Sequence, residues 1–387
     1  MQQYKTSLES YDAFMRLFRR FSRLCGADIM DDNFRVDYRT ITLCSIIASY
    51  MVCVFYSVFH YYPNWLDVLE VFSLMGVGLQ GAAKLYNCID HSEQYRRRNR
   101  FLQKFLRIHS DHPKDNAVLM NVMTKIHVFK TILLLSYFFG MIMIGGFPLG
   151  YYLFYGQLKL AMNFLIPGVD PSSSLGFGIT QAYHLVINVL TVVGIGAMDL
   201  IILVVVASVA GLVDVYRNKL EELDELLDLE DETGSQVRGM VAEIVELHQE
   251  IVRYETNLRD RYEMVNFVQL TSSVSFIALN LFLFYVYDYY HVIGFLLAGV
   301  FQLMEFCLLG TIFSVKNDEM TLAIYNTKWY QLARTEQRSL QLILARSQNS
   351  VELTALNLLP LNVETFVNIM KNIYKCFAML ITYMEPL

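Results

Sequence analysis

The stretch that decides the fold is residues 171–213, which read PSSSLGFGITQAYHLVINVLTVVGIGAMDLIILVVVASVAGLV, with Asp199 as the single acidic or basic residue. A helix needs about 20 mostly apolar residues to cross roughly 30 Å of hydrocarbon, so this stretch can span a membrane and continue beyond it. The whole chain has the same character, because 55% of its 387 residues are hydrophobic and only 18% are charged. Soluble domains carry roughly 25% charged residues. The composition therefore predicts one polytopic membrane protein and excludes a disordered chain.

Six further stretches are apolar enough to predict membrane-spanning helices, which gives an all-α fold with seven spans. In chain order the expected spans cover residues 40–66, 66–87, 131–158, 171–213, 264–287, 289–315 and 361–384. The last span is atypical, because Glu364, Lys371 and Lys375 interrupt it.

The basic residues predict how the chain is oriented in the membrane. Nearly all of the 31 Lys and Arg residues lie before the first span or in the loops that follow the second, fourth and sixth spans, whereas the alternate loops contribute only Lys159. Positively charged loops remain in the cytoplasm, so we expect a cytoplasmic N-terminus and an extracellular C-terminus. The net charge of −6 gives no reason to expect a nucleic-acid partner.

Residues 1–39 alternate arginines with large apolar side chains. The apolar positions are Phe14, Leu17, Phe18, Phe21 and Leu24. This pattern is typical of an amphipathic helix on the inner membrane surface, and a helix docked on the rest of the protein is an equal alternative.

The segment between the fourth and fifth spans, residues 214–262, carries apolar side chains at spacings of three and four and is interrupted at Glu230–Ser235. Such spacing predicts two helices packed on something. We expect spans four and five to continue into the cytosol as these helices and to form a helical anchor domain with residues 316–360. A solvated hairpin is the alternative. The chain then divides into segments 1–39, 40–213 with the ligand-pocket half, 214–262, 263–315, 316–360 and 361–387.

No group of residues in the chain suggests catalysis. There is no phosphate-binding glycine loop, no His-x-x-x-His metal pair and no serine nucleophile elbow, so we expect neither an enzyme nor a bound metal or cofactor. Asp260-Arg261-Tyr262 resembles a triplet of G-protein-coupled receptors, but there it follows the third span and here it precedes the fifth. The cytoplasmic N-terminus also argues against that class.

Charged residues inside spans are costly and therefore informative. We expect Asp199 and Glu305 to be structural and bonded to neighbouring helices. Lys371 and Lys375 are four residues apart and share one face of the last span. A half-polar helix is explained if that face lines water, so the pattern favours a pore, with a re-entrant or interfacial helix as the alternative.

The C-terminal third resembles the insect odorant receptors. The similar residues are the runs Phe306-Cys307-Leu-Leu-Gly310, Ala323-Ile324-Tyr325-Asn-Thr-Lys-Trp329-Tyr330-Gln-Leu332, and Ala345-Arg-Ser347-Gln348 with Ala355 downstream. The resemblance implies an odour-tuning subunit of a non-selective cation channel. A small volatile odorant opens this channel, which is built from four subunits that include a shared co-receptor. It also implies a multi-pass protein of the plasma membrane of sensory dendrites, in contact with membrane lipid.

The same resemblance implies roles for individual residues. Tyr374, Phe377 and Ala378 fall at or beside the hydrophobic constriction of the pore, and Lys375 replaces the usual Ser, one turn after Lys371. We expect Lys375 to turn away from the cation path or to pair with an acidic residue of the co-receptor. Subunit contacts are expected near the end of the sixth span, at Tyr325, Trp329 and Tyr330.

The related gustatory receptors are the alternative. Their last helix carries Thr-Tyr followed later by Gln-Phe; Thr382-Tyr383 is present here, but no such Gln occurs before Leu387. A tastant-gated homomeric channel is therefore the second hypothesis. A transporter is disfavoured, because no internal repeat is visible.

In the odorant receptors the ligand lies in the outer half of the bundle, among the second, third, fourth and sixth spans. Pockets for small volatile molecules are mostly apolar, with a few polar groups that orient the ligand. Bundle packing is the ordinary alternative role for each candidate. The candidates are Phe72, Met75, Leu79, Tyr137, Gly140, Met141, Ile144, Tyr183, Ile187, Asn188, Thr191, Phe295, Leu296, Gly299 and Gln302.

Overall fold

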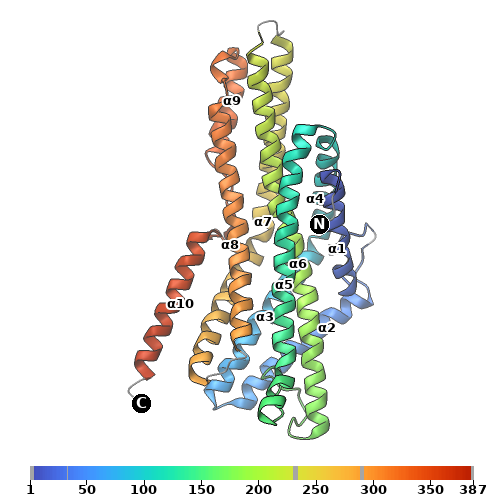
Figure 1. The fold of residues 1–387 in the computed structure, drawn as a ribbon, viewed down its shortest axis with the longest axis vertical. Coiled ribbons are helices and arrows are strands. Elements are labelled where there is room, and N and C mark those ends of the chain that lie inside the picture. Colours follow the sequence, from blue (N-terminus) through green and yellow to red (C-terminus); the bar gives the residue numbers. More distant parts are fainter. Residues whose placement is uncertain (1–3, 33, 230–233, 288–291, 385–387) are drawn as a thin grey trace.

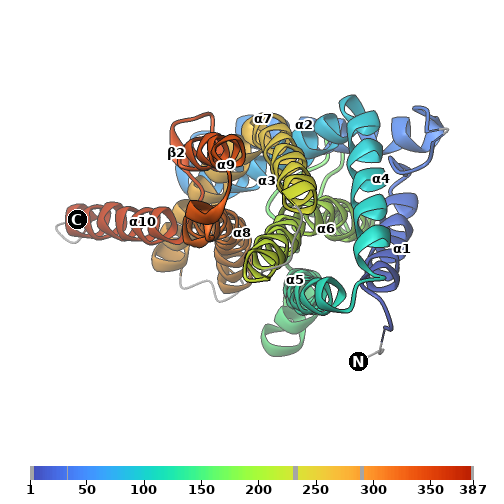
Figure 2. The same ribbon diagram turned by 90° about the horizontal axis from the view of Figure 1, so that it is seen from above.

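The long apolar stretch forms the centre of the molecule. The computed structural model describes residues 4–32, 34–229, 234–287 and 292–384. Helix α6 (Ser174–Leu227) contains 54 residues and begins after Ser173, whose hydroxyl accepts a hydrogen bond from the backbone N–H of Gly176. Nearly every residue of α6 from Ile195 to Val215 is buried, so this part of the helix is covered by its neighbours on all sides (Figures 1 and 2).

Helix α7 (Gly234–Tyr287) is as long as α6 and lies beside it over much of its length (Figure 1). Both helices continue without interruption past the predicted spans, as the sequence predicts for the fourth and fifth of them. The predicted break at Glu230–Ser235 falls mostly on residues 230–233, which lie outside the described residues.

The other long helices complete the bundle. Their bounds are α2 (Tyr38–Tyr61), α3 (Trp65–Asp90), α4 (Ser92–His109), α5 (Pro113–Tyr155) and α8 (Val292–Asn326). Among the described residues, six helices are long and apolar enough to cross a membrane, namely α2, α3, α5, α6, α7 and α8. They coincide with the first six predicted spans, although α5 begins at Pro113, well before the predicted start at Thr131.

Helix α10 (Val363–Met384) corresponds to the seventh predicted span and diverges from the bundle (Figure 1). Its 22 residues are long enough to cross a membrane, but it is not one of the six helices that are apolar enough. One face, with Phe366, Ile369 and Ile373, packs on the core that α7 and α8 share. A two-residue antiparallel ladder between β1 (Thr354–Ala355) and β2 (Leu359–Pro360) precedes α10, and the sequence does not predict it.

Helix α1 (Ser7–Leu24) docks on protein. Tyr11, Phe14 and Phe18 are almost fully buried, and the helix contacts α4, α5 and α6. Because its apolar face is covered by these helices, the expectation that this face lies on the membrane surface is wrong and the docking alternative is correct. Leu24, at its last position, is exposed.

The anchor, defined here as residues 214–262 and 316–360, is a packed helical assembly. It contains the ends of α6 and α8, the first half of α7, a 3-10 turn at Trp329–Gln331 and α9 (Arg334–Ser347). Leu223, Ile244 and Ile251 are fully buried where the helices meet, which excludes the alternative of a solvated hairpin. Ion pairs also cross the interfaces, with Lys316 Nζ at 2.7 Å from Asp214 Oδ1.

Candidate ligand-binding site

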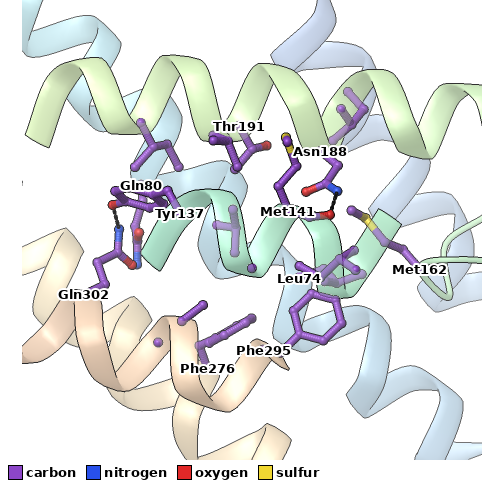
Figure 3. A pocket seen from close by; sticks show the side chains of 18 of the residues that line it. Leu74, Gln80, Tyr137, Met141, Met162, Asn188, Thr191, Phe276, Phe295 and Gln302 are labelled. Carbon is purple, nitrogen blue, oxygen red and sulfur yellow. Dashed lines mark hydrogen bonds between the residues drawn. The ribbon is translucent and has the colours of Figure 1, made fainter. Parts of the chain in front are cut away.

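A cavity of about 110 Å³ lies inside the bundle, in the half away from the anchor (Figure 3). Three helices supply most of its wall through residues that repeat every three or four positions and therefore share one face. On α5 the cavity face begins at Ser136 and ends at Ile144, on α6 it begins at Ile187 and ends at Ile195, and on α8 it begins at Phe295 and ends at Gln302.

Ten of the residues predicted to bind a ligand line this cavity together. They are Tyr137, Gly140, Met141, Ile144, Ile187, Asn188, Thr191, Phe295, Gly299 and Gln302. Their convergence from three helices onto one space is the geometry that a ligand site requires.

Five predicted residues lie elsewhere. Phe72 and Leu79 are exposed on the outer side of α3. Met75 and Tyr183 pack around a neighbouring core cluster, and the hydroxyls of Tyr183 and Ser49 are 2.7 Å apart. Leu296 packs against the main core of the bundle.

Several cavity residues are not evident from the sequence. They are Tyr50, Leu74, Val77, Gln80, Ser136, Met162, Val192, Ile195, Ser273, Phe276 and Ala298. On α3 the prediction chose the wrong side of the helix, because lipid and core are both apolar and the hydropathy of α3 hardly varies around its axis. Gln80 was the available signal, since a buried amide inside an apolar span is expected to face other protein groups.

A buried ion pair lies directly behind one end of the cavity. Lys84 Nζ on α3 is 2.5 Å from Asp199 Oδ1 on α6, and the two side chains are 2% and 0% exposed. The hydroxyl of Tyr137 donates to Asp199 Oδ2, and Gln302 Nε2 donates to Tyr137 Oη at 3.3 Å. Asp199 is therefore bonded to two neighbouring helices, as expected of a structural residue.

Glu305 is the second acid in this region and lies one turn of α8 beyond Gln302. Its side chain is buried, and neither carboxylate oxygen has a hydrogen-bond partner among the described residues. The expectation that neighbouring helices bond to it is therefore wrong for hydrogen bonds.

The residues predicted for the pore lie on α10. Lys371, Tyr374 and Lys375 are exposed along one side of the helix, opposite the packed face. Phe377 and Ala378 are half-buried, and the Phe377 ring lies 5.8 Å from the ring of Tyr285 on α7.

The residues predicted for subunit contacts, Tyr325, Trp329 and Tyr330, are exposed at the end of α8. Within the described part of the chain, no three His, Cys, Asp or Glu side chains are grouped so that they could hold a metal ion.

Comparison with known proteins identifies the family. The family model described as 7tm Odorant receptor matches residues 81–374. Putative odorant receptor 83c of Drosophila melanogaster is 23% identical over 376 residues, which cover 93% of this chain and 94% of the relative. Odorant receptor 10 of Aedes albopictus is 24% identical over 237 residues, which cover 59% of this chain and 62% of the relative.

Solved structures share the fold. The olfactory receptor OR5 of the insect Machilis hrabei superposes with a TM-score of 0.78 at 14% identity, covering 96% of this chain and 98% of that one. The same receptor in complex with eugenol gives a TM-score of 0.75, also at 14% identity, covering 96% and 99%. Since the family model spans most of the sequence, this chain belongs to the 7tm odorant receptor family, as a multi-pass membrane receptor of insect olfaction and not an enzyme.

Proposed function

We propose that the chain is the odour-tuning subunit of an odorant-gated, non-selective cation channel. The observation that carries the proposal is the cavity between α3, α5, α6 and α8, which lies inside the bundle of an odorant receptor and is lined mostly by apolar side chains. A small volatile molecule gains its affinity there from apolar contact, and a few amides and hydroxyls orient it. The relative that was solved with eugenol binds a small aromatic molecule.

Binding is coupled to opening through α8. Phe295, Gly299 and Gln302 line the cavity, and the same helix continues to Thr311, whose hydroxyl oxygen accepts a hydrogen bond from the backbone N–H of Val363 at 2.9 Å. Val363 is the first residue of α10. An odorant that favours one position of α8 shifts a pre-existing equilibrium between closed and open arrangements of α10.

The pore is formed by α10 from four subunits, with the exposed side of the helix toward the cation path. Lys371, Tyr374 and Lys375 occupy that side, and Phe377 and Ala378 lie at its edge against α7. Four copies of this chain would gather eight lysine charges around one path and repel cations. The functional assembly therefore combines this chain with co-receptor subunits, and Tyr325, Trp329 and Tyr330 contribute to the contacts between them.

The experiment is to record odour-evoked current from cells that express this chain alone and from cells that express it with the co-receptor, in the plasma membrane. We expect current only in the second case. Current from the chain alone would contradict the obligate partner and would favour the homomeric arrangement proposed for gustatory receptors.

The role of Lys375 has a separate test. Lys375→Ser in the heteromer should change cation permeation, because on the side toward the path the lysine pairs with an acidic residue of the co-receptor. Unchanged permeation would show that Lys375 does not act on the cation path.

A further inference from the structure

Three amide side chains line the cavity, and each turns its nitrogen toward an oxygen of the protein. They are Gln80 on α3, Asn188 on α6 and Gln302 on α8. The simplest case is Asn188, whose Nδ2 donates to the backbone carbonyl of Met141 at 3.1 Å. A carbonyl oxygen only accepts hydrogen bonds, so the carbonyl oxygen of the Asn188 amide is directed elsewhere.

The orientation of Gln302 follows from the buried ion pair. The ammonium of Lys84 only donates and the carboxylate of Asp199 only accepts, so both oxygens of Asp199 are acceptors. The Tyr137 hydroxyl must then give its single hydrogen to Asp199. Its oxygen is left to accept, and the group that donates to it is Gln302 Nε2 at 3.3 Å. The ion pair thereby sets the direction of the chain of hydrogen bonds that ends at the cavity.

The orientation of Gln80 is determined in a similar way by α7. The hydroxyl of Ser272 donates to the carbonyl of Val268 in its own helix, so its oxygen accepts from Gln80 Nε2 at 2.7 Å. The same nitrogen also lies 3.3 Å from Ser273 Oγ. Both hydrogens of the Gln80 amide are thus engaged with protein oxygens.

Two hydroxyls of the wall also donate their hydrogens to oxygens of the protein. Tyr50 Oη donates to the carbonyl of Leu74 at 2.8 Å, and Ser136 Oγ donates to the carbonyl of Leu133 at 2.8 Å. The protein therefore uses these donors internally, and the amide oxygens and the Thr191 hydroxyl remain.

Gln80 and Gln302 lie with Tyr137 at one end of the cavity, and Asn188 lies toward the other end (Figure 3). Oε1 of Gln80 and Oε1 of Gln302 accept no hydrogen bond from a described residue. Neither oxygen is completely covered by protein atoms. A ligand that fills this end covers both oxygens, and an acceptor buried without a donor is costly. A ligand that brings a donor therefore gains more than one of the same shape without it.

We infer that this end of the cavity selects neutral odorants that donate a hydrogen bond, such as small alcohols and phenols, over ethers and hydrocarbons of similar shape. The inference rests on the proposed function, because it takes the cavity as the odorant site. Tyr137 and the Lys84–Asp199 pair are positioning residues, since they act by holding the Gln302 amide in one orientation. Gln302 keeps a second N–H, which can donate to a ligand that only accepts. The preference for donor ligands is therefore of moderate size.

The size of the cavity sets the probes. At about 110 Å³ it is somewhat smaller than the roughly 150 Å³ engineered cavity of another protein that takes up benzene, so single-ring compounds are appropriate. Phenol has a donor, toluene has nearly the same shape without a polar group, and anisole has an oxygen that only accepts.

The test compares half-maximal concentrations for these three compounds in cells that express the chain with the co-receptor. For the native chain we expect phenol to act at about three- to tenfold lower concentration than toluene and anisole, which is the effect of one neutral hydrogen bond. Gln302→Met and Gln80→Met should each reduce this ratio toward one, because each removes an amide oxygen that accepts from phenol. Met162→Leu, which changes the wall without changing a hydrogen bond, should keep the ratio.

Tyr137→Phe tests the positioning role separately. It preserves the Lys84–Asp199 pair but releases the Gln302 amide to rotate, so the phenol-to-toluene ratio should fall while toluene still opens the channel. Surface labelling checks that each variant reaches the membrane. If one of the two glutamine variants does not reach it, the other is enough for the test.

Equal potency of phenol and toluene on the native chain would overturn the inference, as would a ratio that the glutamine variants leave unchanged. A channel that opens to other odours and not to phenol would also overturn it, while the proposed function would stand. If no odour evokes current from the chain with its co-receptor, the proposed function itself fails.

Discussion

Lys84 and Asp199 are two charged residues whose positions make sense only together. Each sits in an apolar helix and is almost fully buried, yet they are 2.5 Å apart on α3 and α6. The sequence identifies Asp199 as a structural acid, but it does not identify its partner. The two residues lie 115 positions apart in the chain, and only the packing of α3 on α6 brings them together.

The first prediction concerns this ion pair. Removing one partner leaves an uncompensated charge in the bundle, so Lys84→Met alone or Asp199→Leu alone should lower the free energy of unfolding by about 3–5 kcal/mol. The double variant should regain most of that loss, because an apolar pair replaces both charges. The measurement is the thermal stability of the purified receptor.

A matched control is the exposed pair of Lys114 and Glu221, 3.2 Å apart. Lys114→Ala should change stability by less than about 1 kcal/mol. Additive losses in the double variant of Lys84 and Asp199 would contradict the account.

The second prediction concerns His248, which lies in the anchor outside the membrane-spanning segments. Burial, helped by the charge of Arg346, lowers the pKa of His248 to about 4, and its Nε2 lies 2.7 Å from Ser347 Oγ on α9. Above pH 6.5 the ring is neutral in the folded and unfolded states. Between about pH 6.5 and 4 only the unfolded state takes up the proton, so stability falls as the pH falls, by about 1 to 1.5 kcal/mol at pH 5.5.

Glu255, two turns further along α7, titrates in the opposite sense. Burial raises the pKa of Glu255 to about 8, against the lowering effect of Arg346, so its contribution to stability decreases as the pH rises from about 4.5 to 8. The useful quantity is therefore the difference between the native chain and His248→Gln. On going from pH 7.5 to 5.5, the melting temperature of the variant should shift upward relative to that of the native chain. Equal shifts in the two proteins would show that His248 is not the sensitive group.

At the scale of helices, α1 shows why an amphipathic pattern alone does not identify its environment. Phe14 and Phe18 have the spacing of a helix that lies on lipid, but α4, α5 and α6 cover them. Lipid and protein core are both apolar, so the periodicity of α1 is the same in the two cases. Similarly, the apolar surface of α3 gives no sign that Leu74 and Gln80 face the cavity while Phe72 and Leu79 do not.

The third prediction tests the docking of α1. Phe18 is completely buried and Leu24 is 76% exposed. Phe18→Ala leaves a cavity between α1 and the bundle and should lower stability by about 3–5 kcal/mol, whereas Leu24→Ala should have little effect. Thermal unfolding of both variants is the measurement. A similar small loss for both would mean that α1 is not held on the bundle.

The fourth prediction concerns the contact of α8 with the start of α10. A Cβ atom on Gly310 would overlap the backbone carbonyl of Leu361, two residues before α10 begins. Gly310→Ala must therefore displace the backbone that leads into α10 and should cost about 1–3 kcal/mol of stability, with a several-fold smaller maximal current. The control is Gly178→Ala on α6, where an added Cβ meets no atom. Equal currents from both variants would contradict the coupling of α8 to α10.

At the scale of the whole molecule, the strongest predictions from sequence were those that depend on composition alone. Long apolar runs such as residues 171–213, with Asp199 as the single charge, require helices that cross a membrane, and six such helices appear where the sequence places them. The continuation of α6 and α7 into the anchor also follows from the spacing of residues such as Leu220, Leu223 and Ile244. The cavity is less predictable, because its wall depends on the rotation of each helix about its own axis. On α5 and α6 the polar side chains of Tyr137 and Asn188 mark the inward side, and α3 offers only Gln80.

The central claim is that the cavity is where an odorant acts on this receptor, and the current from a blocked cavity tests it most directly. Gly140 lines the cavity, and a Cβ added there makes only an ordinary contact with Ala298, whereas a Cβ on Gly146 of the same helix meets nothing. Gly140→Leu and Gly146→Leu are expressed with the co-receptor at matched surface levels and challenged with the strongest agonist of the native receptor. We predict that Gly140→Leu raises the half-maximal concentration at least about tenfold, a loss of about 1.4 kcal/mol of binding, while Gly146→Leu responds like the native chain. A full response from Gly140→Leu would contradict the account.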